Sequence, residues 1–315
     1  MDVVTVGEAL IGLDSCGHRL LSARTLEKSV GGAESNTAIG LARLGHQVGF
    51  IGRIGDDPLG DEVERTLRAE GVDISYLDRD TTRSTALMLK ERRNGNAVTV
   101  HYHRAGSAGA ALNADDLPVD AIVNARLLHA TGVTLALGDG PRKAAHRAML
   151  VARDAAVPVS LDANFRYKLG TPTELVEQFE AVVELADHVL LSWNDAATCA
   201  GSRDPALVRK YAGSLSRPFT VLKGPRGGAT ALQDGEVVAE VPPYPTEIVD
   251  PVGAGDGFAV GYLHGVLRGQ PVNARLALGA WISAQVVAQA GDYAGLPFRA
   301  ELAARTDEVE SAVTR

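Results

Sequence analysis

A short glycine-rich segment near the C-terminal end of the chain carries the residues best suited to chemistry. It covers residues 250–256, reads DPVGAGD, follows an apolar, strand-like lead-in at Ile248 and Val249, and leads into an apolar, helix-like stretch. The first turn of a helix exposes unpaired backbone N–H groups and the positive end of the helix dipole, so it binds anions, most often phosphate. Gly253 and Gly255 have no Cβ, which lets a ligand approach the backbone closely. The segment therefore predicts a phosphate-binding turn that opens a helix.

Asp256 places a carboxylate in the first turn of that helix, beside the predicted anion site. A carboxylate repels phosphate, but it can accept the proton of a hydroxyl group that attacks phosphorus. We therefore interpret Asp256 as a catalytic base. The same residues could form an ordinary strand-to-helix turn in which the aspartate caps the helix. A dinucleotide fingerprint fits poorly, because Phe258 stands where its third glycine is required.

The segment 31–36, which reads GGAESN, is a second candidate for ligand contact. Gly31 and Gly32 allow a ligand to approach the backbone, and Asn36 can present both a donor and an acceptor. A capped helix start explains the same residues equally well. The turn at residues 53–58 is of similar type, and we interpret its Asp57 as a helix N-cap.

Two arginines stand at the ends of strand-like segments. Arg104 follows Tyr102, and a guanidinium in that position can hold a carboxylate in a bidentate fork. A solvated edge strand is the alternative for this segment. Arg166 follows Asn164 in a loop after a predicted strand, which makes it a second candidate for binding an anion.

A lysine followed by glycines could wrap a nucleotide. Lys223 ends an apolar, strand-like run and precedes Gly224, Gly227 and Gly228. This segment is not a P-loop, because the lysine precedes the glycines and no Gly-Lys-Ser/Thr triplet occurs in the chain.

Strand-like and helix-like segments alternate along most of the chain and would position these residues. We expect apolar strands at residues 47–54, 127–130, 158–162, 188–192 and 219–223. Between them we expect helices at residues 37–44, 58–70, 141–156 and 173–185. Such alternation is typical of an α/β fold with a mostly parallel sheet covered by helices on both faces. Ligands in these folds bind beyond the carboxyl ends of the strands, so the loops after strands should carry the site.

Two segments, at about residues 10–30 and 84–104, interrupt the alternation. The second has Asn94-Gly95-Asn96 at its centre, and Asn-Gly between two extended runs is a strong hairpin signal. Together the segments predict a small β-sheet that serves as a lid over the strand ends. A peripheral hairpin without a function is the alternative.

Composition and charge narrow the class of protein. The 315 residues suit one large α/β domain, and 31 basic against 39 acidic residues give a net charge of −8. This charge argues against nucleic acid or an anionic membrane as the partner. Cys16 and Cys199 lie far apart and match no metal-ligand spacing, which predicts a reducing, cytoplasmic setting. We find no signal-peptide pattern and no apolar run long enough to span a bilayer.

In their order along the chain, the motifs resemble those of the ribokinase-like (phosphofructokinase-B) carbohydrate kinases. The matching segments are residues 31–36, 55–60, 223–224 and 250–256, and the resemblance covers essentially the whole chain. It implies a ribokinase-like three-layer α/β sandwich in which residues 1–315 form a single kinase domain carrying the β-lid. It also implies that Asp256 is the catalytic base and that Gly253, Ala254 and Gly255 form the anion hole. The implied donor is ATP with Mg²⁺, and a requirement for a monovalent cation stays open.

Within that family the chain is most similar to the 2-keto-3-deoxygluconate kinases, in residues 7–8, 102–109, 162–166 and 291–297. This resemblance implies that Arg104 and Arg166 hold the carboxylate of a sugar acid, and that Tyr102 and Asp292 contact its hydroxyl groups. The sugar site is expected to include also Gly31, Gly32, Asn36 and Asp256. The residues expected to contact ATP are Asn164, Arg166, Asn194, Lys223, Gly224, Gly227, Gly228, Gly253 and Gly255.

Three positions depart from the family pattern. Pro251 stands where threonine is usual, which would stiffen the turn. Ala197 replaces a glutamate linked to Mg²⁺ and phosphate, so the sequence does not assign the metal ligands. Met88 lies where these kinases often carry tyrosine, which bears on the choice of substrate.

The expected activity is ATP-dependent phosphorylation of the terminal hydroxyl of a sugar acid, with 2-keto-3-deoxygluconate as the expected substrate. A fructokinase or another neutral-sugar kinase is the alternative, although a neutral sugar would not need Arg104 and Arg166. A non-catalytic protein that binds sugar or nucleotide is a further alternative, and Ala197 is the feature in its favour. The exposed face of the lid predicts a homodimer formed lid to lid.

Overall fold

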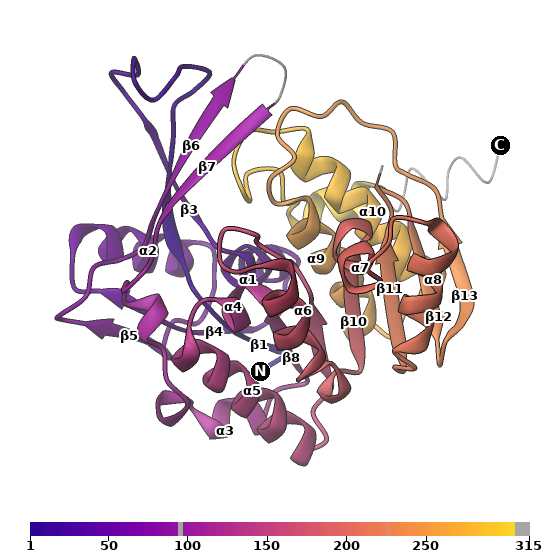
Figure 1. Ribbon diagram of the computed structural model, residues 1–315. Helices are drawn as coiled ribbons and strands as arrows, with labels where there is room; N and C mark the ends of the chain where they lie inside the picture. Colours follow the sequence, from indigo (N-terminus) through magenta and orange to yellow (C-terminus); the bar gives the residue numbers. More distant parts are fainter. Residues whose placement is uncertain (94–96, 226, 306–315) are drawn as a thin grey trace.

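The structure is a computed structural model that describes residues 1–93, 97–225 and 227–305. Its main feature is a nine-stranded sheet with the strand order β13-β12-β11-β10-β9-β8-β1-β4-β5 (Figure 1). All neighbouring strands from β11 to β5 are parallel, whereas β12 and β13 are antiparallel additions at one edge. The strands are β1 (Val3–Val6), β4 (Val48–Gly55), β5 (Leu77–Asp80), β8 (Leu127–Thr131), β9 (Val159–Asp162), β10 (His188–Ser192), β11 (Phe219–Lys223), β12 (Ala229–Gln233) and β13 (Glu236–Val241).

Helices cover both faces of this sheet and bury it. One face packs against α1 (Ala33–Arg43), α2 (Pro58–Ala69), α9 (Ala254–Leu267) and α10 (Val272–Val287). The other face packs against α3 (Val119–Val123), α4 (Gly132–Ala136), α5 (Asp139–Asp154), α6 (Pro172–Glu180), α7 (Trp193–Cys199) and α8 (Pro205–Ser214). Every residue of β8 and β9 is buried, because a parallel sheet between two helical layers has no wet face. The predicted mostly parallel α/β sandwich is confirmed.

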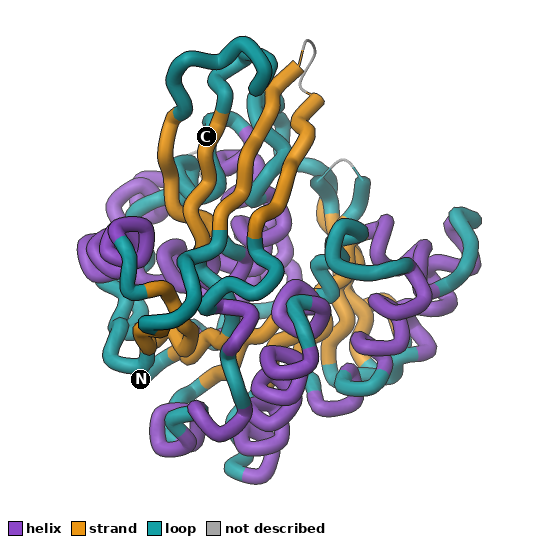
Figure 2. The backbone as a smooth tube through the Cα atoms, turned by 60° about the vertical axis from the view of Figure 1, so that its left-hand side comes forward, coloured by secondary structure: helices purple, strands orange, loops and turns teal. Residues whose placement is uncertain are grey.

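A separate four-stranded sheet projects from the body, as Figure 2 shows at the top of the molecule. It has the order β3-β2-β6-β7, and its strands are β2 (Leu10–Asp14), β3 (Glu27–Gly31), β6 (Leu87–Arg93) and β7 (Ala97–His103). We call this sheet the lid. A second, separate sheet is confirmed, while the predicted Asn94-Gly95-Asn96 turn lies outside the described residues. Leu10, Ala86 and Met88 form a small apolar cluster at the base of the lid.

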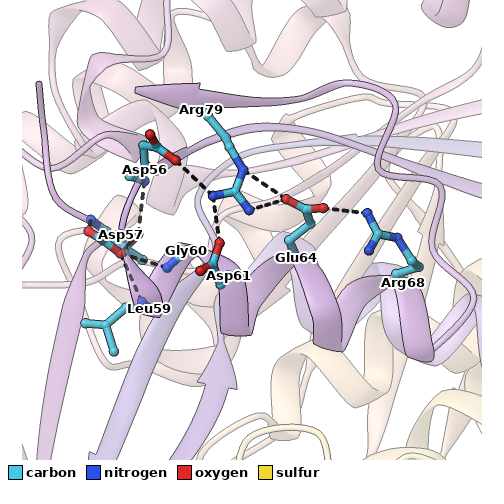
Figure 3. A network of polar contacts seen from close by, with 10 residues as sticks. Asp56, Asp57, Leu59, Gly60, Asp61, Glu64, Arg68 and Arg79 are labelled. Atoms are coloured by element: carbon cyan, nitrogen blue, oxygen red, sulfur yellow. Dashed lines mark hydrogen bonds and ion pairs between the residues drawn. The ribbon is translucent and has the colours of Figure 1, made fainter. Parts of the chain in front are cut away.

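The base of the lid is anchored to the start of α2 by Asp57. Its Oδ1 accepts the backbone N–H groups of Leu59 and Gly60 at 3.0 and 2.8 Å, so it caps the helix as predicted (Figure 3). Its Oδ2 accepts the N–H group of Thr85 at 2.8 Å, two residues before β6. Next to this cap, Arg79 pairs with acidic side chains of the turn and helix, as Figure 3 shows. The same aspartate therefore starts a helix and fixes the chain where it enters the lid.

Three predicted elements differ from the observed ones. The first helix begins at Ala33, so Asn36 lies inside its first turn and not before it. The helix expected at residues 173–185 ends at Glu180 and is followed by a separate 3₁₀ turn, Val183–Leu185. The apolar Ile248 and Val249 form no strand; they are exposed, and the N–H group of Val249 bonds the carbonyl of Val287 at 2.8 Å. In the described part of the chain, no helix is long and apolar enough to cross a membrane.

Candidate active site

The predicted anion site lies at the N-terminus of α9. Gly253 is the N-cap of this helix and has φ +81°, in the left-handed region that favours glycine. A Cβ on Gly253 would lie 2.2 Å from the main-chain oxygen of Asp292, so a larger residue does not fit. Asp250 shapes the turn from inside, because its carboxylate accepts the N–H groups of Val252 at 3.0 Å and Gly291 at 3.3 Å. Ala254, Gly255 and Asp256 then form the first turn, whose N–H groups have no partners within the helix.

Asp256 is buried at this helix start and is held by two asparagine side chains. Asn36 from α1 donates to its Oδ2 at 2.8 Å, and Asn164 from the loop after β9 donates to its Oδ1 at 3.2 Å. Burial raises the pKa of Asp256 to about 7, although the positive charge of Arg166 and the hydrogen bond from Asn36 oppose that rise. A carboxylate with a pKa near neutral can take up a proton and release it at the pH of the cell. The geometry therefore suits a general base.

Lys223, at the end of β11, lies beside the anion site. Its Nζ donates to Oδ2 of Asp162 at 2.6 Å and stands 3.5 Å from the place where a Cβ of Gly255 would be. The ammonium group is therefore close enough to the helix start to meet a phosphate bound there. The glycines that follow form a tight turn, in which the N–H group of Gly224 bonds the carbonyl of Gly228 at 2.6 Å and Gly227 has φ +95°.

A carboxylate next to Lys223 could contribute to a metal site. Oδ1 of Asp162 is buried and has no hydrogen-bond partner in the described part of the structure. Asp195 is close enough that the charge of Asp162 adds to the main effect of burial and raises the pKa of Asp195. No group of three or more acidic, histidine or cysteine side chains gathers around a metal position within residues 1–93, 97–225 and 227–305. Since Mg²⁺ in kinases binds mainly to nucleotide phosphates and water with one or two carboxylates, these residues fit a metal brought by the nucleotide.

Arg104, at the end of the lid, is buried and faces a carboxylate of the body. Its Nη2 lies 2.5 Å from Oε2 of Glu8, and its guanidinium packs on the ring of Tyr102 at 5.0 Å. The hydroxyl of Ser107 donates to the other oxygen of Glu8 at 2.9 Å, and burial raises the pKa of Glu8. The Nε of Arg104 is buried and lacks a hydrogen-bond partner among the residues that the structure describes. Within the described residues, this buried donor is therefore left without a hydrogen bond.

Asp292 connects the lid to the anion site. Its carboxylate forms a buried ion pair with Lys90 of β6, and its Oδ2 is 2.6 Å from the place where a Cβ of Gly31 would be. The predicted sugar-site residues Gly31, Asn36, Asp256 and Asp292 are thus brought to one end of the sheet, where α1 and α9 begin. Lys90 was missed by the sequence analysis. Its only signal was the period of two along β6, which places it on the same face as Met88.

Two of the predicted or expected positions lie apart from this cluster. Asn194 is exposed in the first turn of α7, and no hydrogen bond of its side chain reaches the other candidate residues within the described part of the chain. Ala197 is packed in the hydrophobic core below it, so no acidic side chain replaces the family's glutamate at this position. Arg166 is half-buried, and its effect on the pKa of Asp256 places it near the predicted base.

The comparisons with known proteins agree on one family. The model of the pfkB family carbohydrate kinases matches residues 1–299. A "2-dehydro-3-deoxygluconokinase" from Bacillus subtilis is 33% identical over 310 residues, covering 96% of this chain and 94% of that protein. A "2-dehydro-3-deoxygalactonokinase" from Haloferax volcanii is 31% identical over 296 residues, with 93% of each chain covered. A "fructokinase" from Klebsiella pneumoniae is 32% identical over 307 residues, covering 94% and 96%.

A solved structure is similar to this chain in fold, at a sequence identity close to that of the three relatives. The crystal structure of a PfkB protein from Polaromonas sp. JS666 superposes with a TM-score of 0.87 at 35% identity, covering 96% of this chain and 99% of that one. The three relatives are all named as kinases, but their names differ in the sugar.

Proposed function

The chain belongs to the pfkB family of carbohydrate kinases, and from that premise we propose that it phosphorylates the terminal hydroxyl of a sugar acid with ATP. The proposed substrate is 2-keto-3-deoxygluconate, and the product is 2-keto-3-deoxy-6-phosphogluconate. The observation that carries this choice is the presence of two arginines. Arg166 affects the pKa of Asp256. Arg104 pairs with Glu8, whose main chain lies against Gly32 at the start of α1.

Asp256 acts as the base in the proposed reaction. The acceptor hydroxyl donates its proton to the Asp256 carboxylate while its oxygen attacks the γ-phosphorus of ATP. The bond from that phosphorus to the β-phosphate oxygen breaks, and ADP leaves. Asn36 and Asn164 hold this carboxylate in place, so it does not have to find its orientation when the substrate binds. The base is buried, which keeps its pKa close to the working pH.

The first turn of α9 and Lys223 stabilise the phosphoryl group during transfer. Negative charge on that group would meet the N–H groups after Gly253 and the Lys223 ammonium beside Gly255. Mg²⁺ bound to the nucleotide would neutralise further charge on the phosphates, with Asp162 as the candidate protein ligand. A closed lid would exclude water from the site, so that the sugar and not water receives the phosphoryl group.

The acid substrate is supported by the state of Arg104. Glu8 occupies one Nη group, while the buried Nε keeps an unused donor in the described part of the structure. A sugar carboxylate would satisfy this donor with one charge-assisted hydrogen bond, next to the Nη2 group that pairs with Glu8. Two relatives named for ketodeoxyaldonates support this choice, whereas the relative named as a fructokinase supports the neutral-sugar alternative.

The test is ADP release from Mg-ATP with 2-keto-3-deoxygluconate, 2-keto-3-deoxygalactonate, fructose and ribose. We expect clear preference for a ketodeoxyaldonate, and we expect the double variant Arg104→Ala, Arg166→Ala to lose that activity by about 10²-fold or more in kcat/KM. Arg217→Ala is the control. Arg217 lies before β11, is half-buried like Arg166, and donates to the carbonyl of Glu184, outside the candidate site. Fructose preference in the wild type, with full activity in the double variant, would overturn the acid substrate and leave the kinase assignment intact.

We also propose that two copies associate through their lids. Leu13 of β2 and Leu89 of β6 are register partners on the face opposite to Lys90, and both are only half-buried. Leu13 also packs against the core, and the part of this apolar face that stays exposed on a small projecting sheet favours pairing with an identical face. Light scattering at micromolar concentration should give twice the chain mass, and a monomer would refute the pairing.

A further inference from the structure

We propose that Lys90 is a positioning residue of the acceptor site, which couples closure of the lid to the placement of Asp292 and of the anion hole. This inference rests on the proposed sugar kinase activity but not on the identity of the sugar. It concerns a residue of the lid that lies outside the sequence motifs of the site.

Lys90 is unusual for its place in the fold. It belongs to the projecting lid, yet its side chain is only 2% exposed. Side chains alternate along β6, so Lys90 shares a face with the buried Met88, whose register partner is Tyr102. Tyr102 packs on Arg104, so this is the face of the lid that meets the proposed acceptor.

Asp292 is equally constrained on the side of the body. It is 5% exposed, and its two ends touch two parts of the site. The carboxylate lies against Gly31, where β3 leads into α1, and the main-chain oxygen lies against Gly253, the N-cap of α9. A displacement of residue 292 would therefore change both the acceptor pocket and the shape of the anion hole.

The ion pair between Lys90 and Asp292 joins the lid to the body of the protein. A buried charge without its partner is strongly unfavourable, so both groups need either each other or water. The pair forms part of the wall of a cavity of about 860 Å³ that lies between β3, α2 and residues 290–294. Water in this cavity can hydrate both groups when the lid lifts, and closure then exchanges that water for the ion pair. Lys90 thus favours the closed state and places Asp292 for the hydroxyls of the acceptor.

The lid offers a matched control. Lys28 of β3 also joins the lid to the body, through an ion pair with Glu62 of α2 at 3.1 Å. Its side chain is 44% exposed, and exposed pairs of this kind contribute little. A Lys28 variant therefore shows the effect of losing an ion pair between lid and body, and a Lys90 variant shows the effect of losing the pair that holds Asp292.

The experiment compares Lys90→Met, Lys90→Arg and Lys28→Met in steady-state kinetics, with whichever sugar the wild type uses. For Lys90→Met we expect KM for the acceptor to rise about tenfold or more, while kcat falls less than about threefold and KM for ATP is unchanged. ATP hydrolysis without phosphorylated sugar should increase relative to transfer, because a lid that closes less fully admits water. Lys90→Arg should recover most of the acceptor affinity, and Lys28→Met should behave as the wild type.

A second measurement keeps the inference testable without turnover. Hydrogen–deuterium exchange of β6 and β7 should be faster in Lys90→Met than in the wild type and in Lys28→Met. If Lys90→Met does not fold, Lys90→Gln keeps a hydrogen-bond donor for Asp292 without the charge, leaves Asp292 unchanged, and should show a rise in acceptor KM in the same direction. Wild-type KM in Lys90→Met, or a loss of thermal stability without any change in KM and in lid exchange, would overturn the inference. Absence of wild-type transfer to every sugar would instead overturn the proposed function, and lid exchange would still decide the role of Lys90.

Discussion

Replacing Asp256 by asparagine should remove activity and at the same time stabilise the folded protein at alkaline pH. The activity falls because the amide cannot accept the proton of the acceptor hydroxyl. General bases of this kind contribute about 10²- to 10⁴-fold, so we expect kcat to fall within that range. Substrate affinity should change little, since the shape of the site is kept.

The stability effect follows from the pKa of Asp256 and has a defined sign. The folded protein holds this proton up to about pH 7, whereas the unfolded chain releases it near 3.8. The unfolded state therefore binds fewer protons between these values, and the free energy of unfolding falls as pH rises from about 4 to about 7. The difference of about 3 units between the folded and unfolded pKa corresponds to a loss of roughly 4 kcal/mol of wild-type stability above pH 7. The asparagine variant avoids this loss, but a less favourable hydrogen bond with Asn36 or Asn164 would cost it about 1–2 kcal/mol. The variant should thus gain about 2 kcal/mol at pH 8. Near pH 4, where the wild-type carboxyl is protonated in both states, it should lose about 1–2 kcal/mol through the poorer hydrogen bond.

Two assays check this reasoning. Urea denaturation of both proteins at pH 4 and pH 8 gives the stability difference. The pH dependence of kcat/KM in the wild type should show one ionisation near pH 7, with about a tenth of the plateau value at pH 6. A variant that retains kcat within tenfold of the wild type would show that Asp256 is not the base. Equal stability of both proteins at pH 8 would show that the negative charge of the buried carboxylate does not destabilise the folded state.

Two further substitutions test the turn of the anion site and the anchor of the lid. Gly253→Ala should unfold more easily and lose activity, because its Cβ would lie 2.2 Å from a main-chain oxygen. Gly71→Ala is the control, because Gly71 has nearly the same φ, +80° against +81°, with open space around it. This control should lose only about 1–2 kcal/mol of stability and stay active. Equal effects in thermal melts and activity assays would contradict this account of Gly253. Asp57→Ala should cost about 1–3 kcal/mol in urea denaturation, since it removes the cap of α2 and the acceptor of the Thr85 N–H group. Asp56→Ala, whose side chain is 55% exposed, should be nearly neutral, and equal losses in both would refute the cap argument.

The alternation of strands and helices could be interpreted from the sequence because each element carries its own signal. Apolar runs such as residues 188–192 become buried strands, and Pro58 after Asp57 begins a helix as expected. Helix boundaries differed from the prediction where the local signal is weak. The first helix begins at Ala33 and not at residue 37, because its early residues are polar and give no apolar signal. Contacts with distant segments bury them, such as that of Asn36 with Asp256.

The sequence by itself determined the anion site, because a glycine turn, a helix start and Asp256 lie within seven consecutive residues and need no distant partner to be recognised. The tertiary structure alone decided what surrounds that site. Asn36 lies 220 positions from Asp256 and Lys90 lies 202 positions from Asp292, and no local pattern relates such residues. The pKa of Asp256 belongs to the same class, since it depends mainly on how much water the packed segments exclude from the carboxylate. Local chemistry is written in neighbouring residues, whereas burial and charge pairing arise only when distant segments pack together.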